Sequence, residues 1–161
     1  MIAGGVQATH TRIWVLLGGI GACLFVAGGV DLLLGLLPLS FGVPEWEFGA
    51  IGAFLNRFPL FGLGLTLLLG SALGTARPRL VLLWASVLLL SSVVMFVFGL
   101  LFATNAPVIL ASQAGGPMAS VVRKAIVKAV GQTAVYFLGF GIVAIYSIRS
   151  AGRLRARSRG P

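Results

Sequence analysis

The sequence predicts an all-α integral membrane protein, folded as a bundle of four transmembrane helices. Three observations lead to this class. Of the 161 residues, 58% are hydrophobic and only 9% are charged, and the mean hydropathy is +1.06. The apolar residues gather in four long runs with almost no charge inside them. Each run is close to the roughly 20 residues that a helix needs to cross a bilayer.

The same composition excludes the other common classes. In soluble domains about a quarter of the residues are charged. Disordered chains are poor in apolar residues, and transmembrane β-barrels show short alternating segments rather than unbroken apolar runs. A helix satisfies its own backbone hydrogen bonds in lipid, so a helical bundle is the class that remains.

Prolines and turn residues mark the expected ends of the first three spans. The first span is Ile13–Leu37, which Pro38 ends because proline cannot continue a helix. The second is Pro59–Thr75, since proline suits the first position of a helix. The connection 76–79 is short, so the second span and the third, Leu80–Thr104, must be antiparallel neighbours.

A longer connection, 105–128, precedes the fourth span, Ala129–Ile148. Residues 121–129 place apolar side chains at helical spacing, with basic side chains between them. This pattern predicts a short outer-side interfacial helix before the last span, or an outward extension of that span. The chain is thus divided into an N-terminal tail (1–12), one four-span domain (13–148) and a basic C-terminal tail (149–161).

The basic residues predict the orientation. With both termini on one side, eight of the twelve Lys and Arg residues lie there and four lie opposite. Cytoplasmic loops carry the excess of Lys and Arg, so both termini are expected in the cytoplasm, in a cytoplasmic-type membrane. The arginines of the C-terminal tail are expected to bind anionic lipid headgroups. Because the basic residues flank apolar spans, we expect no nucleic-acid partner.

Asp31 is the one acidic residue within a predicted span. A charged aspartate in a bilayer costs about 2.5–3.5 kcal/mol, so Asp31 needs a polar partner. Arg57 opens the second span at the same outer level and is the first candidate, ahead of Lys128. With Gln132 these residues form a candidate intramembrane polar cluster. Its role is either a buried structural pair or a proton or cation site.

Small residues predict which helix faces pack, because close approach of backbones drives helix association in lipid. In the first span glycine recurs every seven residues, at Gly21, Gly28 and Gly35. In the second span small residues recur every four, at Gly62, Thr66, Gly70 and Gly74. We expect both faces to pack on protein.

No set of residues predicts catalysis, a cofactor or a metal site. His10 is the only histidine, so neither a nucleophile–histidine–acid set nor a usual zinc site can be assembled. Glu45 and Glu47 are expected to be solvated loop charges. The sequence therefore predicts a protein that is not an enzyme and has a structural or accessory role, packing with itself or with another membrane protein. The alternatives are a small oligomeric transporter or channel that uses Asp31 as its ion or proton group, and a lipid-handling protein with an apolar groove.

Overall fold

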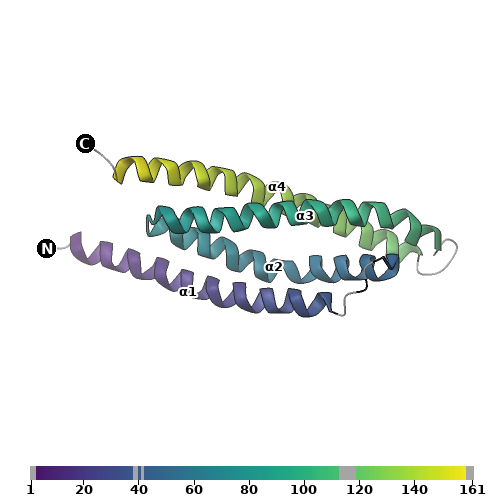
Figure 1. Ribbon diagram of the computed structural model, residues 1–161. Helices are drawn as coiled ribbons and strands as arrows, with labels where there is room; N and C mark the ends of the chain where they lie inside the picture. Colours follow the sequence, from purple (N-terminus) through teal and green to yellow (C-terminus); the bar gives the residue numbers. More distant parts are fainter. Residues whose placement is uncertain (1–2, 38–39, 41, 113–118, 159–161) are drawn as a thin grey trace.

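The computed structural model describes residues 3–37, 40, 42–112 and 119–158. Its four helices are α1 (Ala3–Leu36), α2 (Pro44–Gly74), α3 (Pro78–Ser112) and α4 (Ala119–Ser158). Helices that follow one another run in opposite directions, so α1 begins and α4 ends at the same end of the molecule (Figure 1). All four are long and apolar enough to cross a membrane. The prediction of an all-α chain with four candidate spans is confirmed.

The helices are longer than the apolar runs that predicted them. They contain 31 to 40 residues, which is about 46–60 Å at about 1.5 Å per residue. The described part of the expected N-terminal tail is already helical, because α1 begins at Ala3. At the other end, α4 continues to Ser158 through most of the expected basic tail. Hydropathy marks where a helix is apolar, whereas backbone hydrogen bonding continues beyond that stretch.

The expected start of the second span at Pro59 is wrong. α2 begins fifteen residues earlier, at Pro44, after an extended Val43, and Pro59 lies inside the helix. A second internal proline, Pro107, lies inside α3. Each removes one backbone hydrogen bond, a loss that long membrane helices tolerate. Glu47, expected in a loop, consequently lies in the second turn of α2.

The separate interfacial helix before the last span is also wrong. α4 is one continuous helix of 40 residues from Ala119. Residues 121–129 form its early turns, which is the second alternative that the sequence offered. The segment 119–129 contains neither proline nor glycine, so nothing in it interrupts the helix.

α2 is the central helix of the molecule. It packs along α1 on one side and along α3 on the other, α3 packs along α4, and α4 touches α2 over a shorter length. Within the described residues the backbone of α1 packs closely on α2 alone. The four helices therefore form an open bundle in which α1 is an outer member (Figure 1).

Heptad spacing determines which residues are buried. Most buried residues of α3 follow one another in steps of four and three, or seven, as in helices that pack by interlocking side chains; they are Val81, Ala85, Leu88, Ser92, Met95, Phe102, Ala106 and Ile109, and Ser91 is buried beside them. The face of α2 toward α3 and α4 has the same spacing, at Ile51, Leu55, Phe58, Gly62, Leu65, Leu69 and Ala72. This shared spacing keeps one stripe of each helix against its neighbour.

The turn between α2 and α3 confirms the predicted antiparallel pair. The amide of Arg77 donates to the carbonyl of Ala72 at 3.1 Å, and the amide of Ala76 donates to that of Leu73 at 3.0 Å. These are the hydrogen bonds of a Schellman cap, which requires a left-handed residue. Ala76 occupies that position with φ of 52°.

Candidate functional site

Asp31 on α1 and Arg57 on α2 form an ion pair. Arg57 Nε lies 3.7 Å from Asp31 Oδ1, and Arg57 Nη1 donates to the Asp31 backbone carbonyl at 3.3 Å. The predicted pairing of Asp31 with Arg57 is confirmed. Both side chains are partly exposed, Arg57 to 39% and Asp31 to 49%. The pair therefore lies on the surface of the bundle rather than in its core.

Lys128, the second candidate partner of Asp31, is bonded to a different residue. Its Nζ donates to Oδ1 of Asn56 at 2.9 Å, which joins α4 to α2. Asn56 and Arg57 are adjacent residues of α2. The ion pair therefore links α1 to α2, and the hydrogen bond links α2 to α4 at the neighbouring position. We call Asp31, Arg57, Asn56 and Lys128 the polar row. Asn56 was not among the predicted residues, although it is an amide directly beside Arg57 in the sequence.

Gln132, the remaining member of the predicted cluster, is half-buried one turn after Lys128 on α4. Within the described residues α4 does not pack on α1, and no hydrogen bond joins Gln132 to the polar row. The structure therefore brings three of the four predicted residues into one row and leaves the fourth beside it.

The Asp31 end of the polar row borders an apolar surface. Leu34 on α1 and Leu37, just after the end of α1, lie beyond Asp31 and are 63% and 61% exposed. On α4, Val121 lies on the same side of Lys128 and is also largely exposed. On α4, however, the exposed Lys124 lies one turn before Lys128, between it and Val121. Exposed apolar side chains therefore lie beside the Asp31 end of the row, which distinguishes that end from an ordinary solvated surface.

Hydroxyl groups elsewhere in the helices bond to backbone carbonyls. Ser71 on α2 donates to Trp14 on α1 at 2.7 Å, and Ser92 on α3 donates to Phe137 on α4 at 2.7 Å. Ser91 donates to a carbonyl of its own helix. In the described part of the chain no buried side-chain nitrogen or oxygen lacks a hydrogen-bond partner. The hydroxyls of Ser71 and Ser92 join neighbouring helices, and none of these hydrogen bonds extends the polar row through the bundle.

The predicted glycine face of α1 packs on α2. A Cβ atom on Gly21 would lie 3.0 Å from the carbonyl oxygen of Gly64, and one on Gly28 would lie 2.6 Å from the backbone nitrogen of Phe61. A Cβ on Gly35 would collide with the Arg57 guanidinium. The seven-residue spacing keeps all three glycines on one side of the helix, which confirms this prediction.

The predicted small-residue face of α2 is not a single interface. A Cβ on Gly62 would meet Phe140 of α4, and one on Gly74 would meet Trp14 of α1, whereas Gly70 has open space around it. Thr66 donates to the carbonyl of Leu63 in its own helix. A step of four residues advances about 40° around a helix, so four such positions spread over about 120°. Gly64, which lies outside that series, packs closely on the backbone of α1.

A second polar contact lies near the start of α2. Glu47 accepts hydrogen bonds from the Gly42 amide at 3.0 Å and from Nδ2 of Asn105 on α3 at 2.8 Å. Glu47 was predicted to lie in a loop because Pro59 was expected to start the helix. The contact joins α2 to α3 at the end of the bundle remote from the termini.

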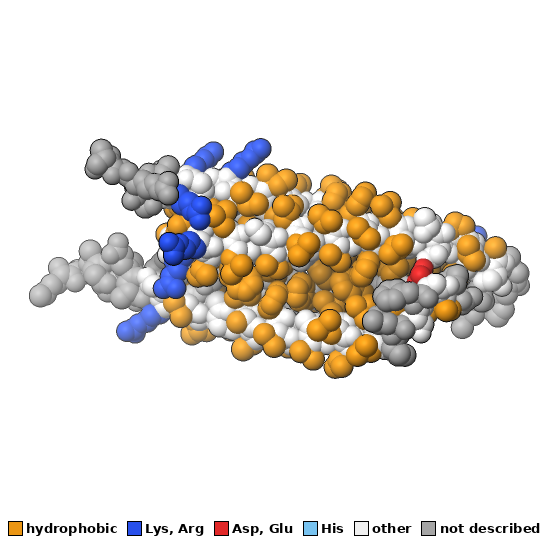
Figure 2. Space-filling view, in the orientation of Figure 1, with side chains coloured by type: hydrophobic (Ala, Val, Ile, Leu, Met, Phe, Trp, Pro, Cys, Tyr) orange, Lys and Arg blue, Asp and Glu red, His pale blue; other side chains and the backbone are white. Residues whose placement is uncertain are grey.

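The opposite end of the bundle is basic. Exposed arginines gather where α1 begins, at the α2–α3 turn and along the last turns of α4 (Figure 2); the described ones include Arg12, Arg77, Arg79, Arg149, Arg153 and Arg155. Apolar side chains cover the middle of the molecule on the face shown.

Among the described residues, no group of histidine, cysteine, aspartate and glutamate side chains could hold a metal ion. Comparison of the chain with family models, curated proteins and solved structures gave no match.

Proposed function

We propose that the chain is an integral membrane protein that crosses the bilayer four times, with both termini in the cytoplasm. Four apolar helices support the crossings. The arginines at one end of the bundle support the orientation, because Lys and Arg are enriched on the cytoplasmic side. The arginines of the basic end bind anionic headgroups there, each contributing about 1 kcal/mol.

We further propose that the protein is a structural membrane component that assembles with a second copy of itself. The observation that carries this proposal is the half-exposed pair of Asp31 and Arg57, beside exposed apolar side chains of α1. Ionisable groups in membrane helices almost always face protein or a water-filled cavity, because exposure to lipid is costly. A second copy that covers the row removes its charges from lipid.

The row is complementary to itself in charge. Asp31 lies at the α1 end, Lys128 at the α4 end, and Arg57 and Asn56 lie between them on α2. In a two-fold symmetric dimer the same patch meets itself with its order reversed. A two-fold axis along the membrane normal, passing beside α2, therefore brings Asp31 of each copy toward Lys128 of the other.

We favour assembly over transport through Asp31 for two reasons. The Asp31 carboxylate is already paired with Arg57. The hydroxyl groups of Ser71, Ser91 and Ser92 bond to backbone carbonyls and do not continue the row toward the basic end. A proton or cation path needs polar groups in sequence along the pore.

The mass of the purified protein in mild detergent tests this proposal. We expect a dimer for the wild type and a several-fold weaker association for Lys128→Glu, which reverses the charge that meets Asp31. Arg123→Glu is the matched control: it makes the same charge change on α4, about 140° around the helix from Lys128. A monomeric wild type, or equal effects of both substitutions, would contradict the proposal.

A further inference from the structure

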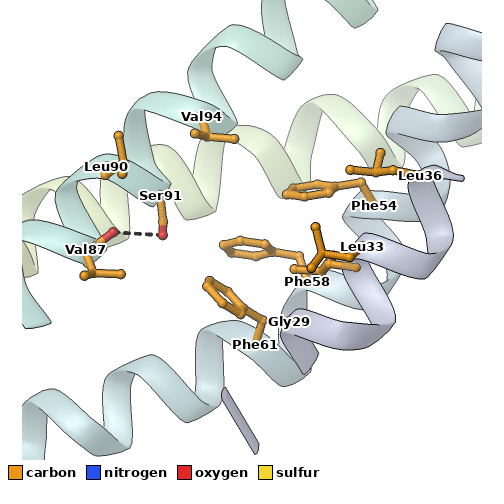
Figure 3. A pocket seen from close by; sticks show the side chains of 11 residues that line it. Gly29, Leu33, Leu36, Phe54, Phe58, Phe61, Val87, Leu90, Ser91 and Val94 are labelled. Atoms are coloured by element: carbon orange, nitrogen blue, oxygen red, sulfur yellow. Dashed lines mark hydrogen bonds between the residues drawn. The ribbon is translucent and has the colours of Figure 1, made fainter. Parts of the chain in front are cut away.

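An apolar groove runs along the bundle between α1 and α3. Because the backbones of these two helices do not approach each other closely in the described residues, side chains of α2 form the floor between them. Phe54, Phe58 and Phe61 supply that floor, and together with α1 and α3 they enclose a cavity of about 360 Å³ (Figure 3). Ligand pockets start at about 300 Å³, so the groove is large enough to hold part of a small molecule.

The groove opens sideways. Leu33 on α1 and Leu90 on α3 form its two edges and are 68% and 64% exposed, whereas Phe58 on the floor is 2% exposed. Ser91 is the one polar side chain in the lining, and its hydroxyl donates to the carbonyl of Val87 at 2.9 Å. A molecule that enters from the side therefore meets an apolar wall. In a membrane, the molecule available at that side is a lipid chain.

Both ends of the groove are defined. At the end toward the termini, Phe25 and Trp84 close it with an edge contact, their ring centroids 5.7 Å apart. At the other end the lining continues through Leu36 into a second apolar cavity of about 210 Å³. From Val87 to Leu101, which line opposite ends, α3 rises about 21 Å. One leaflet with its headgroups is about 20–22 Å thick, half of a bilayer.

At the end remote from the termini, a carboxylate lines the second cavity. Glu47 and Trp46 line the second cavity. The Gly42 amide and the Asn105 side chain hold the Glu47 carboxylate in place by hydrogen bonds. A carboxylate attracts an ammonium group, and an indole ring attracts it through its π face. The groove is therefore apolar along its length and suited to a cation at its mouth.

We propose that this groove binds one phospholipid with an ammonium headgroup, such as a phosphatidylethanolamine, from the leaflet remote from the termini. One acyl chain lies on the phenylalanine floor and ends near Trp84. The ammonium group lies against Glu47 and Trp46. Gly29 of the groove and Asp31 of the polar row are about 200° apart around α1. The lipid site and the dimer face are thus on different sides of the helix and can be tested separately.

Photolabelling in vesicles tests the acyl-chain site. The probe is a phosphatidylethanolamine with a diazirine near the end of one chain, and mass spectrometry locates the adducts. We expect adducts concentrated at the groove residues of α1 and α3. Gly29→Leu fills the groove, since an added Cβ there meets only ordinary contacts, the nearest at 3.8 Å from the Phe61 ring. It should reduce these adducts several-fold, and Val94→Phe on α3 should do the same from the other wall.

Gly19→Leu is the matched control, because it makes the same change at a glycine of α1 that has open space and does not line the groove. It should leave the adducts unchanged. Equal labelling of wild type, Gly29→Leu and Val94→Phe would overturn the site. A cross-link through the groove to a second copy or another protein, in place of lipid adducts, would also overturn it.

The headgroup assignment has its own measurement. The ratio of labelling by the ethanolamine probe to that by a phosphatidylglycerol probe with the same chains should be several-fold above one in the wild type. Glu47→Gln should bring this ratio to about one while adducts in the groove persist. A ratio near one in the wild type, or an unchanged ratio in Glu47→Gln, would overturn the ammonium site.

Discussion

Gly28 of α1 lies directly against the backbone of Phe61 on α2: a Cβ atom at Gly28 would be 2.6 Å from the Phe61 nitrogen and 2.7 Å from its Cα. Neither backbone can give way locally, so the substitution Gly28→Leu must push the helices apart. We expect it to lower the free energy of unfolding by about 1–3 kcal/mol, as overpacking does in other interiors. Thermal unfolding in detergent measures this.

Gly70→Leu is the control for that experiment. It makes the same change at a glycine of α2 with open space around it. A Cβ atom added there would have no heavy atom within 4 Å, apart from its chain neighbours and the backbone of its own helix. Its thermal midpoint should stay close to that of the wild type. If Gly70→Leu is the more harmful of the two, the interface between α1 and α2 is misplaced.

Asp31 should respond to substitution as a structural residue. Asp31→Asn keeps a group that can accept a hydrogen bond from Arg57, whereas Asp31→Leu leaves that guanidinium without its carboxylate partner. A buried hydrogen-bonding group left without its partner costs about 1–3 kcal/mol, and the partial exposure of Arg57 lowers that cost at this site. We expect Asn to be the milder substitution, both in thermal stability and in the dimer fraction. Equal losses of stability and dimer fraction with both substitutions would contradict this structural role.

The left-handed conformation of Ala76 predicts a stabilising substitution. Its φ of 52° costs a residue with a Cβ about 1–2 kcal/mol, a cost that glycine avoids. Ala76→Gly should therefore raise the thermal midpoint. Ala103→Gly, at an exposed position inside α3, should lower it, because glycine weakens a helix interior by about 1 kcal/mol. The opposite order would show that the α2–α3 turn is not capped in this way.

The basic end of the bundle predicts the orientation. A reporter inserted at Gly42, in the connection between α1 and α2, should report the outer side, and one fused to the C-terminus should report the cytoplasm. The physical reason is the retention of arginine-rich ends on the cytoplasmic side. A C-terminal reporter that is active only outside would contradict both the four crossings and the orientation.

The four helices could be predicted because long apolar runs are visible in the sequence itself, without knowledge of tertiary contacts. Their ends could not be predicted, because Pro59 and Pro107 lie within helices whose backbone continues past them. The pairing of Asp31 with Arg57 was predictable because both lie at the same level of adjacent helices. Asn56 was missed because its partner, Lys128, is on a helix distant in the sequence.

The small-residue faces show the same limit. The face of α1 was predicted because a spacing of seven stays on one side of a helix. In α2 the spacing of four drifts around the helix, so Gly62 and Gly74 face different neighbours and Gly64 was overlooked. Which glycine packs depends on the register between two helices, and a single sequence does not contain that register.

Disulfide cross-linking tests the central claim, that a second copy covers the polar row. Ala27 and Gly131 are exposed and lie one turn from Asp31 and Lys128, so cysteines there leave the row intact. Within one chain α1 and α4 do not pack on each other, and a disulfide needs Cα atoms within about 7 Å. A bond between these positions therefore joins two copies. Replacing the exposed Cys23 by serine removes the competing thiol.

The account predicts that Ala27→Cys/Gly131→Cys forms covalent dimers in membranes. The control pair, Val26→Cys/Gly131→Cys, should remain largely monomeric, because Val26 is exposed at the same level but about 100° around α1. Dimers that form equally with both cysteine pairs would reflect random collision and would contradict the claim that a second copy covers the polar row. The absence of a dimer with the first pair, under conditions that oxidise its cysteines, would also contradict it.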